Sequence, residues 1–175
     1  MERIKIKFII LVVSLSLFSC KKDRFKLSDV TETDIMGNLV GNVNQNDWKL
    51  YKLSQATDFD MKVFNQLNTG TPFNVNDYHS CDSIYNFNLI AYPNPIISNC
   101  MLNFNLTTNI EYVKALQIVV SKDGKLIEKS GVDPGFFPDY KINALVKRDF
   151  IFYYIFVRSD SCLYFGKGNV IGCTN

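Results

Sequence analysis

The chain has 175 residues and a formal net charge of +2, and 47% of its residues are hydrophobic. Removal of residues 1–19 as a leader would leave 16 basic and 16 acidic side chains, since the leader holds three of the 19 cations and one of the 17 acids. A neutral domain lacks the basic face of nucleic-acid-binding proteins, so we expect no nucleic-acid partner. The remaining length suits one domain with a substantial core.

Residues 1–19 have the pattern of a signal peptide. Three cations, Arg3, Lys5 and Lys7, precede an apolar run of 11 residues from Phe8 to Phe18. As a helix this run would be about 16 Å long, roughly half the thickness of a bilayer core. The run therefore suits the apolar region of a signal peptide better than a membrane span.

The next residues carry a lipidation motif. Leu17-Phe18-Ser19-Cys20 resembles a lipobox, the site at which lipoprotein signal peptidase cuts before a lipid-modified cysteine. An ordinary secretory cleavage site would need a small residue in place of Leu17. The resemblance implies a lipoprotein whose Cys20 carries diacylglycerol and palmitate. Lys21 stands where some bacteria use Asp to retain lipoproteins at the inner membrane, so the resemblance implies the cell outer membrane.

Beyond Cys20 we expect two parts. Residues 20–46 are polar and interrupted by glycines, which is typical of a flexible tether. Residues 47–175 form the folded domain, which opens with a short strand around Trp48. One helix is predicted near residues 58–68, because Thr57 can cap it and apolar residues recur at helical spacing.

The second half of the chain predicts strands. Residues 100–106 and 116–120 alternate between apolar and polar side chains, and Asp123-Gly124 favours a type I′ hairpin turn. Phe150–Val157 is continuously apolar, as expected of an interior strand that is covered on both faces. The predicted fold is all-β with one short helix, an Ig-like antiparallel β-sandwich with the helix capping one end.

One tetrapeptide carries a family resemblance. Tyr92-Pro93-Asn94-Pro95 is followed by an amphipathic strand, a hairpin and a late aromatic strand. Residues 89–173 thereby resemble the Ig-like C-terminal sorting domains of type IX secretion cargo. The resemblance implies the sandwich fold and, as one alternative, a secretion-linked role. The two prolines also have a structural explanation, because they end strand pairing at this point.

Cysteine and histidine positions give few candidates for chemistry. Four cysteines remain after Cys20, and a hairpin turning at residues 166–168 would place Cys162 opposite Cys173, which suggests a disulfide between them. His79, the single histidine, lies two residues from Cys81 in a polar loop and forms no recognisable catalytic or zinc pattern. We therefore expect no metal and no cofactor.

These patterns favour a non-enzymatic envelope lipoprotein. It would act as a binding or assembly module, attached to the membrane by its lipid and recognising a protein or glycan ligand. One alternative is a hydrolase acting on glycans, with its acids in the loops around residues 70–83 or 131–139. A pocket with two close carboxylates would support that alternative.

Overall fold

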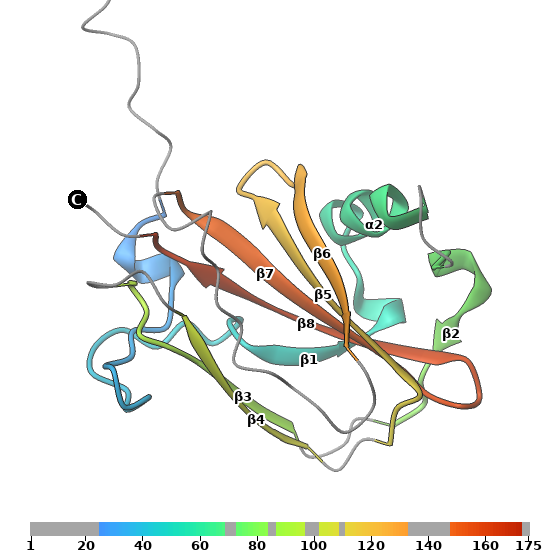
Figure 1. Cartoon of the computed structure of the whole chain (residues 1–175), viewed down its shortest axis with the longest axis horizontal. Helices are drawn as coiled ribbons and strands as arrows, with labels where there is room; N and C mark the ends of the chain where they lie inside the picture. The colour runs from blue at the N-terminus through green and yellow to red at the C-terminus, as the bar shows by residue number, and fades with distance from the viewer. Residues whose placement is uncertain are drawn as a thin grey trace, which may run out of the picture.

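The computed structural model describes residues 25–68, 73–83, 87–96, 102–108, 111–132 and 148–172. Its main feature is a six-stranded sheet in the order β1-β8-β7-β5-β6, with β2 also paired to β8 (Figure 1). All pairs are antiparallel except β2 with β8. The strands are β1 (Lys49–Lys52), β2 (His79–Ser80), β5 (Lys114–Ser121), β6 (Leu126–Val132), β7 (Phe150–Val157) and β8 (Cys162–Val170). A separate pair, β3 (Phe87–Tyr92) with β4 (Asn103–Thr108), forms a two-stranded antiparallel sheet.

β7 is the interior strand that the sequence predicts. All eight of its residues are buried, and β5 and β8 pair with its two edges. Phe152, Tyr154 and Phe156 pack in the core cluster that includes Leu89 and Ala91 of β3. The alternate side chains, Ile151, Tyr153, Ile155 and Val157, pack in the cluster on the opposite face. The prediction of a strand covered on both faces is therefore confirmed.

The helix α2 (Asp58–Asn65) covers the second face and continues as the 3₁₀ turn η3 (Gln66–Asn68). Thr57 caps it as predicted, and the Asp60 carboxylate accepts a hydrogen bond from the Thr57 amide nitrogen at 2.9 Å. Val63 and Phe64 pack against the sheet. The helix therefore lies on one face of the main sheet and does not cap an end of the fold. Its apolar side chains cover the face of β7 that carries Ile151, Tyr153 and Ile155. Three further 3₁₀ turns are η1 (Leu27–Asp29), η2 (Leu53–Gln55) and η4 (Val75–Asp77).

Asp60 also joins α2 to the sheet. Its buried carboxylate accepts hydrogen bonds from the Tyr153 hydroxyl at 2.7 Å and from the Lys167 ammonium at 2.6 Å. Burial raises the pKa of this carboxyl, but the hydrogen bonds from Lys167 and Tyr153 outweigh it and hold the pKa below its ordinary value. The capping acid is therefore an ionised contact between helix and sheet.

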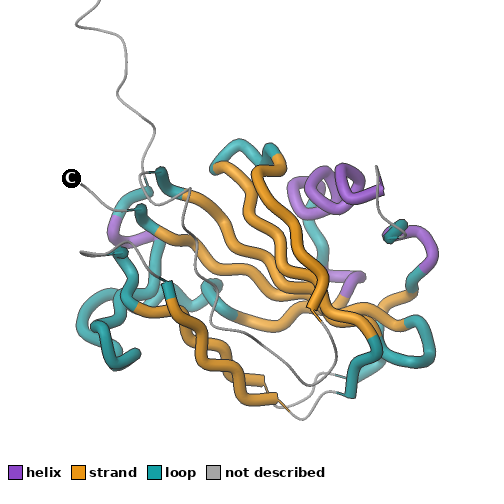
Figure 2. Tube along the Cα trace, viewed as in Figure 1, coloured by secondary structure: helices purple, strands orange, loops and turns teal. Residues whose placement is uncertain are grey.

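The fold class is all-β with a single short α-helix among the described residues (Figure 2). The main sheet is open and antiparallel in its long strands. The layer facing it contains two described strands, β3 and β4, so the Ig-like sandwich is not confirmed. Residues 133–147, between β6 and β7, lie outside the described residues.

The β5–β6 hairpin turns where the sequence predicts, but the type I′ prediction is wrong. The Gly124 amide donates to the Ser121 carbonyl at 2.8 Å, and Ser121 pairs with Lys125 through a 2.9 Å bond. A type I′ turn needs a positive φ at both central residues, but of Asp123 and Gly124 only Gly124 has one, at +80°. This is a three-residue loop, a type I turn followed by a left-handed glycine.

The tether prediction for residues 20–46 is wrong for the described part, residues 25–46. Val30 is fully buried, and the Thr33 hydroxyl donates to the Ala91 carbonyl of β3 at 2.7 Å. The amide nitrogen of Phe25 donates to Asp149, just before β7, at 2.6 Å. Polar residues of this segment thus hydrogen-bond to the rest of the protein, so the folded domain begins before Asp47.

Asn94 of the Tyr-Pro-Asn-Pro motif links this segment to the sheet. Its fully buried side-chain amide donates to the carbonyls of Thr31 at 3.1 Å and Asn169 at 2.9 Å. Its amide oxygen accepts from the Ile171 amide nitrogen at 3.2 Å. The motif therefore has a structural role at the end of β8.

We predict that Gly124→Val lowers the free energy of unfolding by roughly 1–3 kcal/mol. A β-branched residue resists φ +80°, and a Cβ at this position would lie 3.0 Å from the Phe59 ring. Urea denaturation measures the loss. Gly131→Val in β6 is the matched control, since nothing lies within 4 Å of a Cβ added there. Equal effects of the two substitutions would contradict the turn assignment.

Candidate functional site

A pocket of about 250 Å³ lies between the N-terminal segment, the start of β1 and β3. Its wall combines an indole, small and branched apolar side chains, hydroxyls, amides and one carboxylate. Its volume is below the range of about 300–1,000 Å³ that holds drug-sized ligands, so it suits a single ring. The lining residues are Thr31, Thr33, Leu39, Val43, Asn44, Gln45, Asp47, Trp48, Lys49, Leu89 and Ala91.

The backbone of β8 fixes the indole of Trp48. A Cβ at Gly168 would lie 2.3 Å from the indole ring, so only glycine lets the ring lie this close to the strand. Trp48 has φ 58° and is buried, with its ring centroid 6.5 Å from that of Phe152. Trp48 packs in the core, and the same side chain also lines the pocket.

The carboxylate of Asp47 is held by the backbone. Its two oxygens accept hydrogen bonds from the amides of Thr31 and Asn169, each at 2.8 Å. Burial raises the pKa of Asp47 to about 6 in spite of these bonds. Both oxygens hold the N-terminal segment against β8, which makes Asp47 a positioning residue of the pocket wall.

The pocket does not have the geometry of a glycan hydrolase. Glycoside hydrolysis needs two carboxyl groups facing the scissile bond. Asp47 is the single carboxylate among the described residues that line the pocket, and backbone donors occupy it. In the first loop that the sequence suggested for catalytic acids, Asp77 and Asp82 are exposed. Residues 133–139 of the other loop lie outside the described residues.

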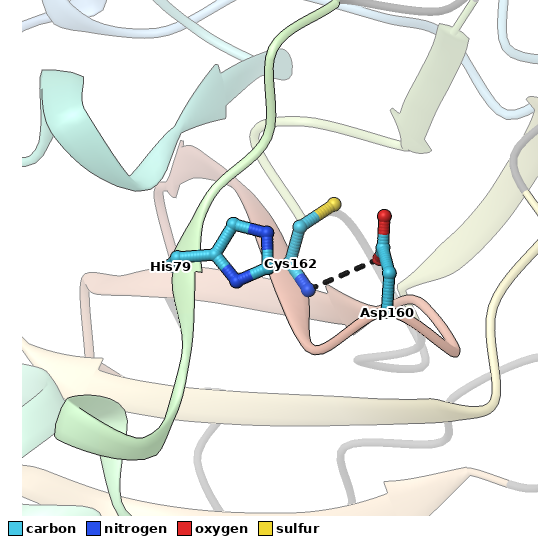
Figure 3. A group of neighbouring side chains, drawn as sticks. All are labelled: His79, Asp160 and Cys162. Atoms are coloured by element: carbon cyan, nitrogen blue, oxygen red, sulfur yellow. Dashed lines mark hydrogen bonds between the residues drawn. The ribbon is translucent and has the colours of Figure 1, made fainter.

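A second cluster brings together His79, Asp160 and Cys162 (Figure 3). One potential ligand atom of each lies within 4.8 Å of the others. The sulfur of Cys162 is bonded to Cys81, however, so it offers no thiolate to a metal. Asp160 accepts from the Cys162 amide at 3.2 Å and pairs with Arg158 at 3.3 Å. In this oxidised form two side chains remain as ligands, too few for a tetrahedral zinc site.

The disulfide corrects the predicted pairing of Cys162 with Cys173. Cys162 bonds to Cys81, with a Cα–Cα distance of 5.0 Å. Gly166 and Gly168 lie inside the continuous strand β8, so the expected hairpin between the two predicted partners does not form. The parallel pairing of β2 with the start of β8 brings Cys81 to Cys162 instead. Cys173 itself lies outside the described residues.

Cys20 and the leader also lie outside the described residues, so the lipid anchor stays a prediction. Among the described residues, no helix is both long and apolar enough to cross a membrane. No family model, no curated protein and no solved structure matches the chain. The resemblances to lipoproteins and to sorting domains therefore rest on the sequence motifs alone.

We predict that Asp47 makes the fold more stable in mild acid. Its folded-state pKa of about 6 lies above its ordinary value of 3.8, so its contribution is full below pH 3.8 and is lost as the pH rises through 6. Between pH 7 and pH 4.5 this amounts to about 2 kcal/mol. Asp47→Asn cannot titrate. Urea denaturation at the two pH values should show the wild type gaining this much relative to the variant, and a constant difference would refute the assignment.

We also predict that Cys81→Ser lowers the free energy of unfolding by about 4 kcal/mol, because the bond closes a loop with a sequence separation of 81 residues. Denaturation with and without dithiothreitol measures the effect in the wild type. Cys173→Ser is the matched control and should retain the response to the reductant. A loss of that response in Cys173→Ser would restore the Cys162–Cys173 pairing.

Proposed function

We propose that this chain is a lipid-anchored protein of the bacterial outer membrane that binds a ligand without catalysing its conversion. The observation that carries this proposal is the pocket beside Trp48. It is concave, its indole wall is fixed by Gly168, and its one carboxylate is occupied by the backbone. A rigid wall without a free acid favours recognition over chemistry.

The anchor is supported by the sequence. The lipobox-like residues Leu17 to Cys20 follow a cationic start and a short apolar run. Two or three acyl chains on Cys20 would hold the protein stably, since each buried CH₂ contributes about 0.8 kcal/mol. The domain would then face the periplasm or the cell surface from that membrane.

The ligand class that fits best is a sugar ring of a glycan. A sugar presents an apolar face of C–H groups and a rim of hydroxyls. The pocket offers Trp48, Leu89 and Ala91 to the apolar face, with Gln45 and Lys49 exposed as donors at the rim. A secretion-linked role has less support, because the hydrogen bonds of Asn94 give the Tyr-Pro-Asn-Pro motif a structural purpose.

The anchor is tested by metabolic labelling with a palmitate analogue in the native bacterium. We expect label on the wild type and none on Cys20→Ala, which should also leave the membrane fraction or keep its leader. Mass spectrometry that finds an unmodified amino terminus on the mature wild type would refute the anchor.

The pocket is tested on an array of bacterial and eukaryotic cell-surface oligosaccharides, followed by calorimetry with the sugars that bind. Lys49→Ala removes a rim donor and should weaken binding about tenfold, the effect expected of a lost charged hydrogen bond. Lys125→Ala, in the β5–β6 turn, is the matched control and should bind as the wild type does. Binding to no sugar, or equal binding by both variants, would refute the glycan assignment.

A further inference from the structure

The N-terminal segment carries an unusual share of exposed apolar side chains. Six of the eight large hydrophobic residues that are exposed within the described part of the chain lie in residues 27–43. Four belong to one loop, residues 32–42: Ile35 is 61% exposed, Met36 76%, Leu39 58% and Val40 62%. Apolar side chains gathered in this way on a folded surface mark a contact with another molecule or with a membrane.

This loop is a defined structure. Its two arms pair through the Thr33–Leu39 bridge and through bonds from Glu32 N to Asn42 O at 2.8 Å and from Val40 N to Glu32 O at 3.2 Å. At the tip the Asp34 carboxylate accepts the amides of Met36 and Asn38 at 2.8 and 2.9 Å. The hydrogen bonds hold the tip so that its apolar side chains remain in solvent.

The loop lies at the end of the fold from which the proposed anchor leads. Phe25 is bonded to Asp149, next to β7, and Thr33 at the loop's base bridges to Asn94, which bonds to Asn169 near the end of β8. In Figure 1 the blue N-terminal segment lies at the end of the sheet where β7 begins and β8 ends. The five peptide bonds from Cys20 to Phe25 span at most about 18 Å, so a lipid on Cys20 would keep this end close to the bilayer.

We propose that the loop makes a second, shallow contact with the membrane, through Ile35, Met36, Leu39 and Val40. This proposal rests on the lipid anchor proposed above. The apolar tip would enter the boundary between headgroups and acyl chains, where exposed apolar side chains gain by leaving water. Two acids, Glu32 at the base and Asp34 beside the tip, limit the depth, since their carboxylates accept hydrogen bonds from the loop's own amides and stay near the headgroups.

This contact would set the orientation of the ligand pocket. Leu39 of the loop and Val43, directly after it, line the pocket and are also exposed, so the loop contributes to the pocket wall. A membrane-bound loop would therefore place the pocket mouth beside the bilayer surface. The acyl chains would supply the binding strength, and the loop would fix how the domain sits.

The experiment compares Met36→Trp with Val113→Trp in the full-length, naturally lipidated protein. Val113 is 55% exposed and lies outside the N-terminal segment, which makes it the matched control. Each protein is added to vesicles of phosphatidylethanolamine and phosphatidylglycerol that contain brominated lipid, and the emission of Trp48 in the wild type is subtracted. We expect the emission at position 36 to be quenched at least twofold more than that at position 113.

Flotation of the same samples separates the two proposals. If the protein floats with the vesicles and positions 36 and 113 are quenched equally, the loop contact is refuted while the anchor stands. A protein that fails to float would refute the anchor and the loop contact together. An Ile35→Asp substitution in the Met36→Trp background should reduce the quenching to the level of position 113 without preventing flotation.

Discussion

The structure depends on the need to cover β7 on both faces. The strand places eight apolar residues in the middle of the sheet, and burial of each such side chain contributes roughly 1.5–3 kcal/mol. Side chains of α2 cover one face, and Leu89 and Ala91 of β3, with Leu102 and Trp48, cover the other. β8 makes room for the second layer with two glycines: the Tyr154 ring lies against Gly166 and the indole against Gly168. The cores on both sides follow from the composition of one strand.

A second constraint is the satisfaction of polar groups where β8 ends. Asn94 and Asp47 are buried, and each must find partners or destabilise the fold. They find them in the backbone of Thr31 and Asn169, which joins the N-terminal segment to the sheet. The pocket lies between this segment and β3. The bonds that keep the segment in place also occupy both carboxylate oxygens of Asp47.

Local patterns in the sequence were sufficient for β7, for the capped helix after Thr57 and for the position of the β5–β6 turn. Each depends on residues that are neighbours in the chain. The Cys81–Cys162 bond, the role of Asn94 and the packing of residues 25–46 depend on partners 58 or more residues away. Polar residues such as Thr33 look the same in a sequence whether they bond to water or to a distant carbonyl. For this reason the sequence did not predict the pocket, and Trp48 was the one lining residue that the sequence analysis singled out.

The two ends of β8 have different characters. At Cys162 a disulfide and the β2 pairing hold the strand to the rest of the fold. At Asn169, roughly 23 Å away along an extended strand, side-chain hydrogen bonds hold a segment that carries a pocket and an exposed apolar loop. Hydrogen bonds to a loop can open locally at less cost than breaking a covalent bond or a sheet. The end of the fold nearer to the proposed anchor is thus the end best able to adjust to a ligand, while the disulfide keeps the opposite end fixed.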